Sequence, residues 1–212
     1  MNLEKSIQNY LDELSSNSPT PGGGNVAALC GVLASSLGVM VCNLTIGKKK
    51  YLDFEPEAIR IKESLTSFKN DFLKFAKRDN EAFDRVMEAF KLSKDNEAQI
   101  NFRNEKIQNA SWEAAIVPAE VIRKCNEVLP LIKIISERGN QNSLSDAGVA
   151  ASLISASAEG AYLNVLINCS SLSNQVTAGE FLKTNEIIFN EVKEKSATII
   201  SSIIKKITKR NL

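Results

Sequence analysis

Apolar residues recur along most of this chain at the three- and four-residue spacing of an amphipathic helix. The pattern predicts a first helix over residues 4–16, with Ile7, Leu11 and Leu14 on its apolar face. The alternation of apolar and polar residues that indicates β-strands is absent from the sequence. The pattern therefore predicts an all-α fold, a bundle of long helices.

The longest regular pattern predicts a helix over residues 56–92, with an apolar stripe that is interrupted once. The stripe consists of Ile61, Leu65, Phe68, Phe72, Phe75, Phe83, Val86 and Phe90. Asp79 holds the stripe position between Phe75 and Phe83. Burial disfavours the ionised form of a carboxyl group and raises its pKa, so a buried Asp79 could both donate and accept protons near neutrality. Two alternatives stay open: rotation of the helix could expose Asp79, or Lys77 or Arg78 could pair with it.

Two segments are almost free of charge. Residues 25–47 carry no charged side chain, and residues 147–179 carry only Glu159, a second candidate for a buried acid. The first segment is long enough to span a membrane, and three lysines follow it. Because both segments are rich in Gly, Ala, Ser and Cys rather than Leu, Ile and Phe, we favour two small-residue helices, 25–46 and 147–168, packed against each other at the bundle centre.

Further helices are expected in the second half of the chain. One runs over 96–117, with Ile100, Ile107 and Trp112 among its apolar positions, and Pro118 either kinks it or starts a new helix. The face that follows comprises Val121, Ile122, Cys125, Val128, Leu129, Ile132 and Ile135, and Gly139 ends it.

A turn and a last helix complete the predicted bundle. Ser143 and Asp146 have the spacing of a capping box at the start of the next helix. The last helix is predicted over 178–209, and its inward positions are Ile188, Val192, Ile199, Ile203 and Ile207.

Composition narrows the functional classes. A chain of 212 residues is the size of one domain, which we place over 1–212. Its 26 basic and 25 acidic side chains argue against a nucleic acid as the main partner. The four cysteines are scattered and lack CxxC spacing, so free thiols in a reducing compartment are expected. The N-terminus lacks the apolar stretch of a signal peptide, and we expect a cytoplasmic protein without a membrane span.

The chain contains no histidine. This removes the commonest zinc ligand and the usual proton carrier at neutral pH. Acid–base chemistry would fall to a carboxyl group, lysine, cysteine or tyrosine with a shifted pKa. We expect no metal site.

A loop rich in proline and glycine precedes the first uncharged segment. It contains Pro21, Gly22, Gly23 and Gly24. Three glycines before a helix can present bare N–H groups to an anion or a carbonyl oxygen, although the spacing is not that of a phosphate or dinucleotide loop. The loop could equally be a rigid connector.

Other polar residues have both a structural and a binding interpretation. Lys48, Lys49 and Lys50 could complement the C-terminal dipole of a helix or bind a substrate with several carboxylates. Asn164 and Asn168 lie one turn apart in an apolar run and need hydrogen-bond partners if they are buried, either in a ligand or at a helix end. Asp146 could start a helix or contact a ligand.

Five segments together resemble one known family, the folate cyclodeaminase/cyclohydrolase family. This family includes the C-terminal half of the bifunctional formiminotransferase–cyclodeaminase and stand-alone methenyltetrahydrofolate cyclohydrolases. The resemblance covers about residues 5–200, and it lies in residues 19–28 (PTPGGGNVAA), 43–51 (NLTIGKKKY), 79–83 (DNEAF), 117–118 (VP) and 139–168, which begins GN and ends GAYLNVLIN.

The resemblance implies an all-helical homodimer with sites near the subunit interface and no cofactor beyond the tetrahydrofolate substrate. It gives Asp79 an acid–base role and directs the glycine loop and the lysine cluster towards folate. Asn80 departs from the family pattern, in which we expect a small residue, and this puts fine specificity in doubt.

The expected reaction is that of 5-formiminotetrahydrofolate cyclodeaminase, which yields 5,10-methenyltetrahydrofolate and ammonia. The first alternative is 5,10-methenyltetrahydrofolate cyclohydrolase, in which water opens the same ring. The second alternative is a helical dimer that binds folate or another protein without catalysis.

Overall fold

The structure, a computed structural model, describes residues 6–210, and in that range it contains helices and no strand. The all-α prediction is confirmed. The elements in chain order are α1 (Ile7–Leu14), α2 (Gly23–Thr45), the 3₁₀ helix η1 (Lys49–Phe54), α3 (Glu55–Phe90), α4 (Glu97–Arg138), the 3₁₀ helix η2 (Gln141–Ser143), α5 (Leu144–Ser170) and α6 (Gln175–Arg210).

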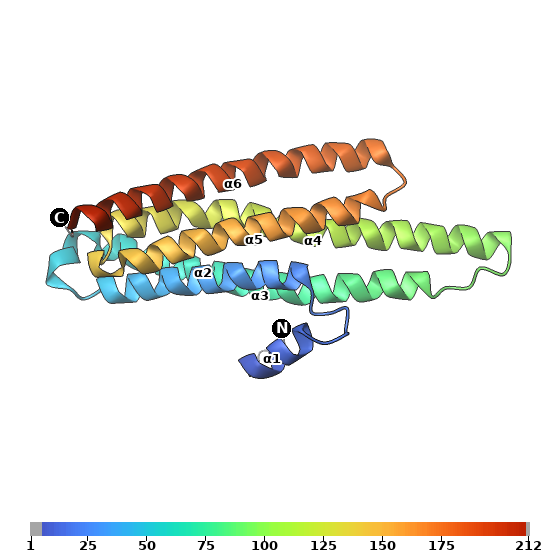
Figure 1. Cartoon of the computed structure of the whole chain (residues 1–212), viewed down its shortest axis with the longest axis horizontal. Coiled ribbons are helices and arrows are strands. Elements are labelled where there is room, and N and C mark those ends of the chain that lie inside the picture. The colour runs from blue at the N-terminus through green and yellow to red at the C-terminus, as the bar shows by residue number, and fades with distance from the viewer. Residues whose placement is uncertain (1–5, 211–212) are drawn as a thin grey trace.

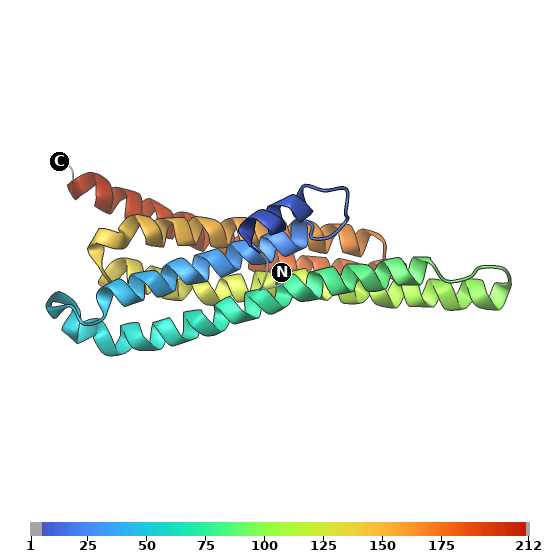
Figure 2. The same cartoon turned by 90° about the horizontal axis from the view of Figure 1, so that it is seen from below.

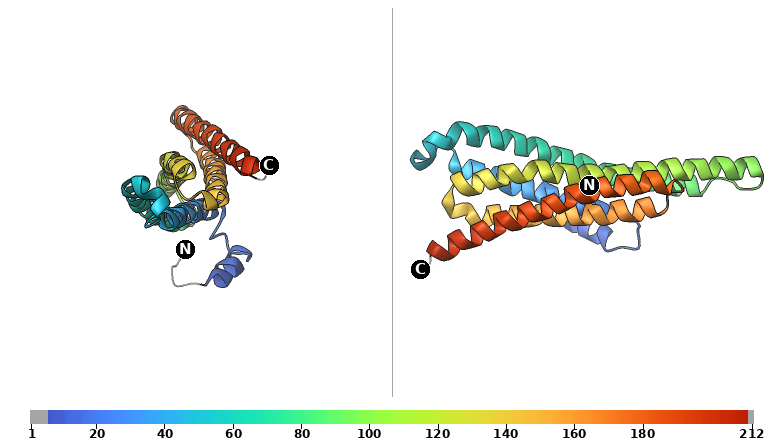
Figure 3. Two further views of the ribbon diagram at one scale, coloured as in Figure 1. Left: turned by 90° about the vertical axis from the view of Figure 1, so that its left-hand side faces the viewer. Right: turned by 90° about the horizontal axis from the view of Figure 1, so that it is seen from above.

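The long helices α2 to α6 form one elongated bundle (Figure 1). Helix α2 packs against α3 and α5, and α4 lies between α3, α5 and α6. The two uncharged segments therefore pack against each other, as the sequence predicts. The hairpin between α3 and α4 projects beyond the rest of the bundle, while α1 lies beside α2 outside it (Figure 2). Figure 3 shows α6 crossing the bundle at an angle, with its C-terminal end away from α3.

Helices α2 and α3 run antiparallel and meet through a repeated glycine contact. Glycines of α2 seven residues apart face stripe residues of α3 seven residues apart, and the pairs are Gly38 with Leu65, Gly31 with Phe72 and Gly24 with Asp79. A Cβ atom would lie 2.7 Å from Leu65 Cδ1 at the first glycine and 2.8 Å from Asp79 Oδ2 at the third. Asp79 thus occupies the same inward register as two buried apolar side chains, which is what the interrupted stripe predicts.

Helix α4 continues through Pro118 and Pro130, so the start of a new helix at Pro118, one of the two outcomes expected there, is wrong. Proline at 118 lacks the N–H that would bond the carbonyl of Ala114. In the folded chain the side-chain Nδ2 of Asn168 on α5 donates to that carbonyl at 2.9 Å. The helix therefore continues because a residue far away in the sequence satisfies the orphaned acceptor.

Several other expectations from the pattern are wrong. Ile7 and Leu11 are 80% and 48% exposed, because α1 is two turns long and buries only Tyr10. Phe90 and Ile100 are also exposed, since they lie on the projecting α3–α4 hairpin, which has fewer covering helices.

The start of α5 also differs from its prediction. The side chain of Ser143 makes no capping hydrogen bond, because the preceding 3₁₀ turn gives Ser143 a φ of −105° and a ψ of 21° rather than the extended backbone of a capping residue. Glu159, the second candidate for a buried acid, is exposed on the outer side of α5.

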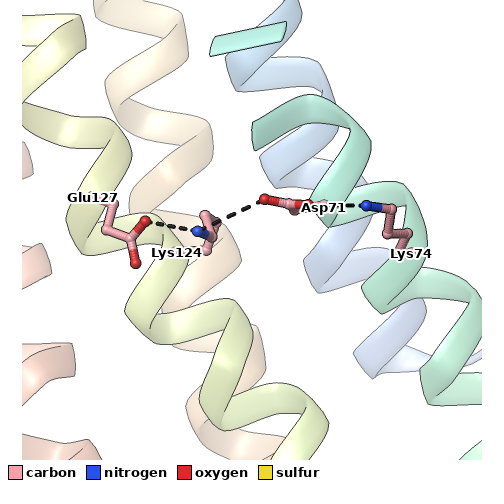
Figure 4. A network of polar contacts seen from close by, with 4 residues as sticks. All are labelled: Asp71, Lys74, Lys124 and Glu127. Carbon is pink, nitrogen blue, oxygen red and sulfur yellow. Dashed lines mark hydrogen bonds and ion pairs between the residues drawn. The ribbon is translucent and has the colours of Figure 1, made fainter. Parts of the chain in front are cut away.

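An ion-pair network joins α3 to α4 (Figure 4). Lys124 Nζ lies 3.7 Å from Asp71 Oδ2 and 2.7 Å from Glu127 Oε2, and it lies over the Phe68 ring at 4.7 Å from the ring centroid. Lys74 completes the network through Asp71. These contacts fix the two helices two turns from Asp79.

Two helical segments of the described chain, α2 and Gln141–Ser170, are long and apolar enough to cross a membrane by length and composition. Within the bundle, 56% of the most apolar window of the first segment and 39% of that of the second are buried. Core helices of soluble proteins meet the same criterion. Because the two helices cover each other, we propose that both are core helices.

Candidate active site

A cavity of about 340 Å³ opens where the start of α2, the C-terminal third of α3 and the end of α5 meet. This volume is in the range of small-molecule sites. Its walls are formed by Pro19, Thr20, Gly22, Gly23, Gly24, Asp79, Ala82, Phe83, Val86, Ala114, Asn164, Ile167 and Asn168. The fold therefore brings Asp79, the three glycines of the loop and the two asparagines of α5 together. Pro21 is buried beside the cavity and does not line it.

Asp79 is the only titratable side chain among these lining residues. Burial raises its pKa from 3.8 to about 6, and the backbone N–H of Asn25 partly offsets this by hydrogen bonding to the carboxyl group. That N–H belongs to the first turn of α2, where helical N–H groups have no partner within the helix. The carboxyl group can therefore exchange a proton near neutral pH.

Neither of the alternatives for Asp79 that the sequence left open is found. The adjacent cations have other partners: Lys77 Nζ lies 3.5 Å from Glu81 Oε1, and Arg78 Nη1 lies 2.6 Å from Glu120 Oε2. Asp79 faces Gly24 rather than solvent alone, and a Cβ at Gly24 would lie 2.6 Å from Asp79 Cγ. Only glycine permits this close approach of α2 to the carboxyl group.

The two asparagines of α5 are oriented by the backbone. Asn164 Nδ2 donates to the carbonyl of Gly160 at 2.8 Å, and Asn168 Nδ2 donates to that of Ala114 at 2.9 Å. A carbonyl oxygen can only accept, so these bonds fix which end of each amide is nitrogen. In the part of the chain that the structure describes, neither Oδ1 atom receives a donor. Both amides can therefore accept hydrogen bonds from N–H groups of a ligand.

The remaining predicted site residues lie elsewhere in the protomer. Lys48, Lys49 and Lys50 follow the C-terminal end of α2, and Asp146 lies in the first turn of α5 at the same end of the bundle. The 23 residues of α2 separate them from the glycine loop by about 35 Å. A single protomer therefore does not bring the lysines and Asp146 to the cavity.

The sequence pattern missed Asn25 and Tyr10. Asn25 is fully buried at the start of α2, and Tyr10 Oη donates to its Oδ1 at 3.0 Å. A polar amide directly after three glycines and before an apolar helix was the available signal, because a buried amide requires several hydrogen-bond partners.

Other reactive groups are absent from the described part of the cavity wall. Residues 6–210 contain no group of three or more His, Cys, Asp or Glu side chains that could hold a metal ion. Cys42 and Cys125 lie in the core, and burial raises the pKa of their thiols to about 11 and about 12, so both are protonated at neutral pH. Among the described lining residues, only Asp79 carries a group that can exchange a proton near neutral pH.

Fold and cavity together define an elongated helical-bundle protein with one proton-exchanging carboxyl group at the start of a glycine-led helix. The chain belongs to the formiminotransferase-cyclodeaminase family, whose model matches residues 6–186. The resemblance seen in the sequence is thereby confirmed.

The chain is 40% identical to the methenyltetrahydrofolate cyclohydrolase of Methylorubrum extorquens, over 90% of this chain and 97% of that one. It is 26% identical to the mouse formimidoyltransferase-cyclodeaminase, over 95% of this chain but only 37% of that longer protein. The solved structure of the formiminotetrahydrofolate cyclodeaminase from Thermotoga maritima superposes with a TM-score of 0.80 and 33% identity, over 95% of this chain and 98% of that one.

Proposed function

We propose that this chain is a 5,10-methenyltetrahydrofolate cyclohydrolase with Asp79 as its acid–base group. The observation that carries the proposal is the 40% identity to a cyclohydrolase of nearly the same length. The sequence alone favoured the cyclodeaminase reaction, and this identity supports the alternative better.

The cavity suits the chemistry of ring opening. In the substrate one carbon bridges N5 and N10 and shares a positive charge with them. Ionised Asp79 accepts a proton from water as the water oxygen bonds to this carbon. The carbon–N5 bond then breaks, its electron pair remains on N5, and Asp79 gives the proton to N5. The hydroxyl proton leaves to solvent as the formyl group forms, so one water is consumed and one proton is released.

The other lining residues would bind and orient the folate ring. The Oδ1 atoms of Asn164 and Asn168 accept hydrogen bonds, and the bare N–H groups of the glycine loop donate them. Phe83, Val86 and Ile167 supply apolar walls for a flat ring. We propose that the reaction needs no metal and no cofactor beyond the substrate.

The cyclodeaminase reaction is the second candidate, and the match to the Thermotoga maritima structure supports it. In that reaction N10 attacks the formimino carbon and ammonia leaves. One carboxyl group could take the proton from N10 and give it to the leaving nitrogen, so the same cavity fits both substrates.

A paired assay tests the assignment. Purified protein is mixed with methenyltetrahydrofolate and, separately, with 5-formiminotetrahydrofolate, and methenyltetrahydrofolate absorbance is followed. Buffer without protein measures uncatalysed hydrolysis, and the Asp79→Asn variant measures the turnover that remains without the carboxyl group. We expect loss of absorbance from the first substrate to be faster with the parent protein. Turnover of only the second substrate would reassign the chain as a cyclodeaminase, and no turnover with measurable binding would indicate a non-catalytic folate-binding dimer.

We propose that the chain acts as a cytoplasmic homodimer. The four cysteines are free thiols, which suits a reducing compartment. The outer side of α5 exposes four large apolar residues, Val149, Leu163, Leu166 and Ile167. Exposed apolar surface of this kind marks interaction sites. Ile167 also lines the cavity, so a second subunit covering this side would border the site.

A further inference from the structure

One buried amide joins three helices next to Asp79. Asn25 has no exposed surface, and its Nδ2 donates to the carbonyl of Ala76 at 2.7 Å and to Asn80 Oδ1 at 3.2 Å. Its Oδ1 accepts from the hydroxyl of Tyr10 at 3.0 Å. Both protons of the amide and its oxygen are therefore engaged, and they link α1, α2 and α3.

The hydrogen bonds of the Asn25 side chain reach α3 on both sides of Asp79. Ala76 lies three residues before Asp79 and Asn80 one residue after it, so the Asn25 side chain binds the turn of α3 that carries the carboxyl group. The backbone N–H of the same asparagine hydrogen bonds to Asp79. A shift of α2 along α3 would therefore break the hydrogen bonds of the Asn25 side chain and, at the same time, move the Asn25 N–H away from the Asp79 carboxyl group.

Asn80, which differs from the small residue expected in the family, takes part in this contact. The resemblance led us to expect a small residue at 80, and the structure shows the Asn80 side chain accepting from the buried amide. A small apolar residue at 80 would leave one proton of Asn25 without this acceptor. The two asparagines thus depend on each other.

We infer that Asn25 is a positioning residue that holds the α3 turn carrying Asp79 against the start of α2, and that Tyr10 ties α1 to this contact. The inference rests on the proposed role of Asp79 as the acid–base group.

No other charged side chain of the described cavity wall faces Asp79. Lys77 and Arg78 are paired with Glu81 and Glu120, and neither α2 nor α5 adds a charged side chain to the cavity wall. Burial raises the pKa of Tyr10, with a further contribution from Cys30, so its hydroxyl is neutral at physiological pH.

The test compares Asn25→Ala with the parent in turnover of methenyltetrahydrofolate and in its pH dependence. Small misplacement of a catalytic group costs up to about 100-fold in rate, so we expect kcat to fall at least about tenfold while KM stays within about threefold. The inflection of the pH–rate profile should move to higher pH, because the Asn25 N–H that lowers the pKa of Asp79 is no longer held in place.

Thr45→Val is the matched control. Thr45 is also buried, and its hydroxyl donates to the Val41 carbonyl at 2.7 Å and accepts from the Asn140 N–H at 2.9 Å, at the far end of α2. We expect this variant to lose stability and keep the pH–rate inflection of the parent. Tyr10→Phe removes one hydrogen bond from Asn25 and keeps the ring, so it should fold and shift the inflection in the same direction by a smaller amount.

A merely structural Asn25 would give a lower Tm with the parent kcat and inflection, and this result would overturn the inference. The same holds if Asn25→Ala does not fold and Tyr10→Phe leaves the inflection unchanged. The pKa of Asp79 is also measured without turnover, as the pH dependence of the stability difference between Asp79→Asn and its parent, with and without Tyr10→Phe. If the parent shows no turnover but this pKa rises, the proposed function fails and the positioning role stands.

Discussion

Replacing Asp79 by asparagine keeps the size of the side chain and removes its titration. In the folded chain burial raises the pKa of Asp79 from 3.8 to about 6, so the folded state holds a proton more tightly than the unfolded state does. The stability that this provides is full below about pH 4 and is lost as the pH rises through about 6. At pH 8 the parent therefore carries the whole cost of an ionised, half-buried carboxyl group.

The size of that cost follows from the two pKa values. The rise of the pKa from 3.8 to about 6 corresponds to about 3 kcal/mol. A neutral asparagine avoids it, so we expect Asp79→Asn to be more stable than the parent at pH 8 by up to about 3 kcal/mol. For a chain of 212 residues this is a rise in Tm of about 6–12 °C. The difference should vanish below about pH 4.

The assay combines thermal unfolding with turnover. Tm is recorded from pH 4 to pH 8 at one protein concentration, because the stability of the proposed dimer would depend on concentration. Turnover of methenyltetrahydrofolate is measured on the same samples, and we expect kcat of the variant to fall at least about 100-fold. In the parent, kcat/KM should rise through pH about 6 as Asp79 ionises.

Asp71→Asn is the control for this experiment. Asp71 lies on the same helix two turns earlier, and its carboxyl group pairs with Lys74 and Lys124 outside the cavity. This variant should keep its turnover and gain no stability at pH 8. A variant at 79 that turns over within about threefold of the parent would refute the acid–base role, and a loss of stability at pH 8 would refute the argument from burial.

Three further predictions test the site and the assembly. Gly24→Ala places a methyl group against the Asp79 carboxyl group and should lower kcat at least about 100-fold. Gly179→Ala is the control, because a Cβ atom there has no neighbour within 4 Å, and its kcat should match that of the parent. Equal turnover of the two variants would contradict the close approach of α2 to Asp79. Replacing Lys48, Lys49 and Lys50 by alanine should raise KM for polyglutamylated substrate, and the increase should be smaller at high salt. Unchanged kinetics would indicate that the lysines only complement the C-terminal dipole of the helix. Because the lysines lie about 35 Å from the cavity of their own protomer, a raised KM for the monoglutamate as well would indicate that the partner subunit supplies them. Leu163→Glu places a charge on the exposed apolar side of α5 and should shift a dimer towards monomers in light scattering; a parent that is already monomeric at micromolar concentration would refute the homodimer.

The sequence predicted the helices well where the apolar period was long. The helix expected over 56–92 is observed as Glu55–Phe90, and the stripe position of Asp79 faces inward as expected. Such patterns are reliable because the helical period is local, and the same face must be covered wherever the helix packs. The prediction failed for α1, where Ile7 and Leu11 are exposed, and on the projecting α3–α4 hairpin, where Phe90 and Ile100 are exposed.

The new helix that was one of the two outcomes expected at Pro118 shows a different limit of the prediction. Whether a helix continues past a proline depends on what satisfies the freed carbonyl. Here that partner is Asn168, 54 residues from Ala114, and no local pattern contains this information. By contrast, the separation of the lysines from the glycine loop could have been foreseen, because a helix over residues 25–46 puts its two ends far apart. The family resemblance assigned both the lysines and the glycine loop to folate binding, although the length of this helix separates them.

By itself, the sequence determined the all-α class, the small-residue contact between α2 and α5, and the place of Asp79 in an apolar stripe, since each depends on residue type and helical spacing. The tertiary structure decided which of the candidate residues share a cavity and how Asp79 titrates. The pKa of a carboxyl group depends on the atoms that exclude water from it and on the donors that reach it. Here those atoms come from the start of α2, from α4 and from the end of α5, segments whose approach is set only when the whole bundle packs.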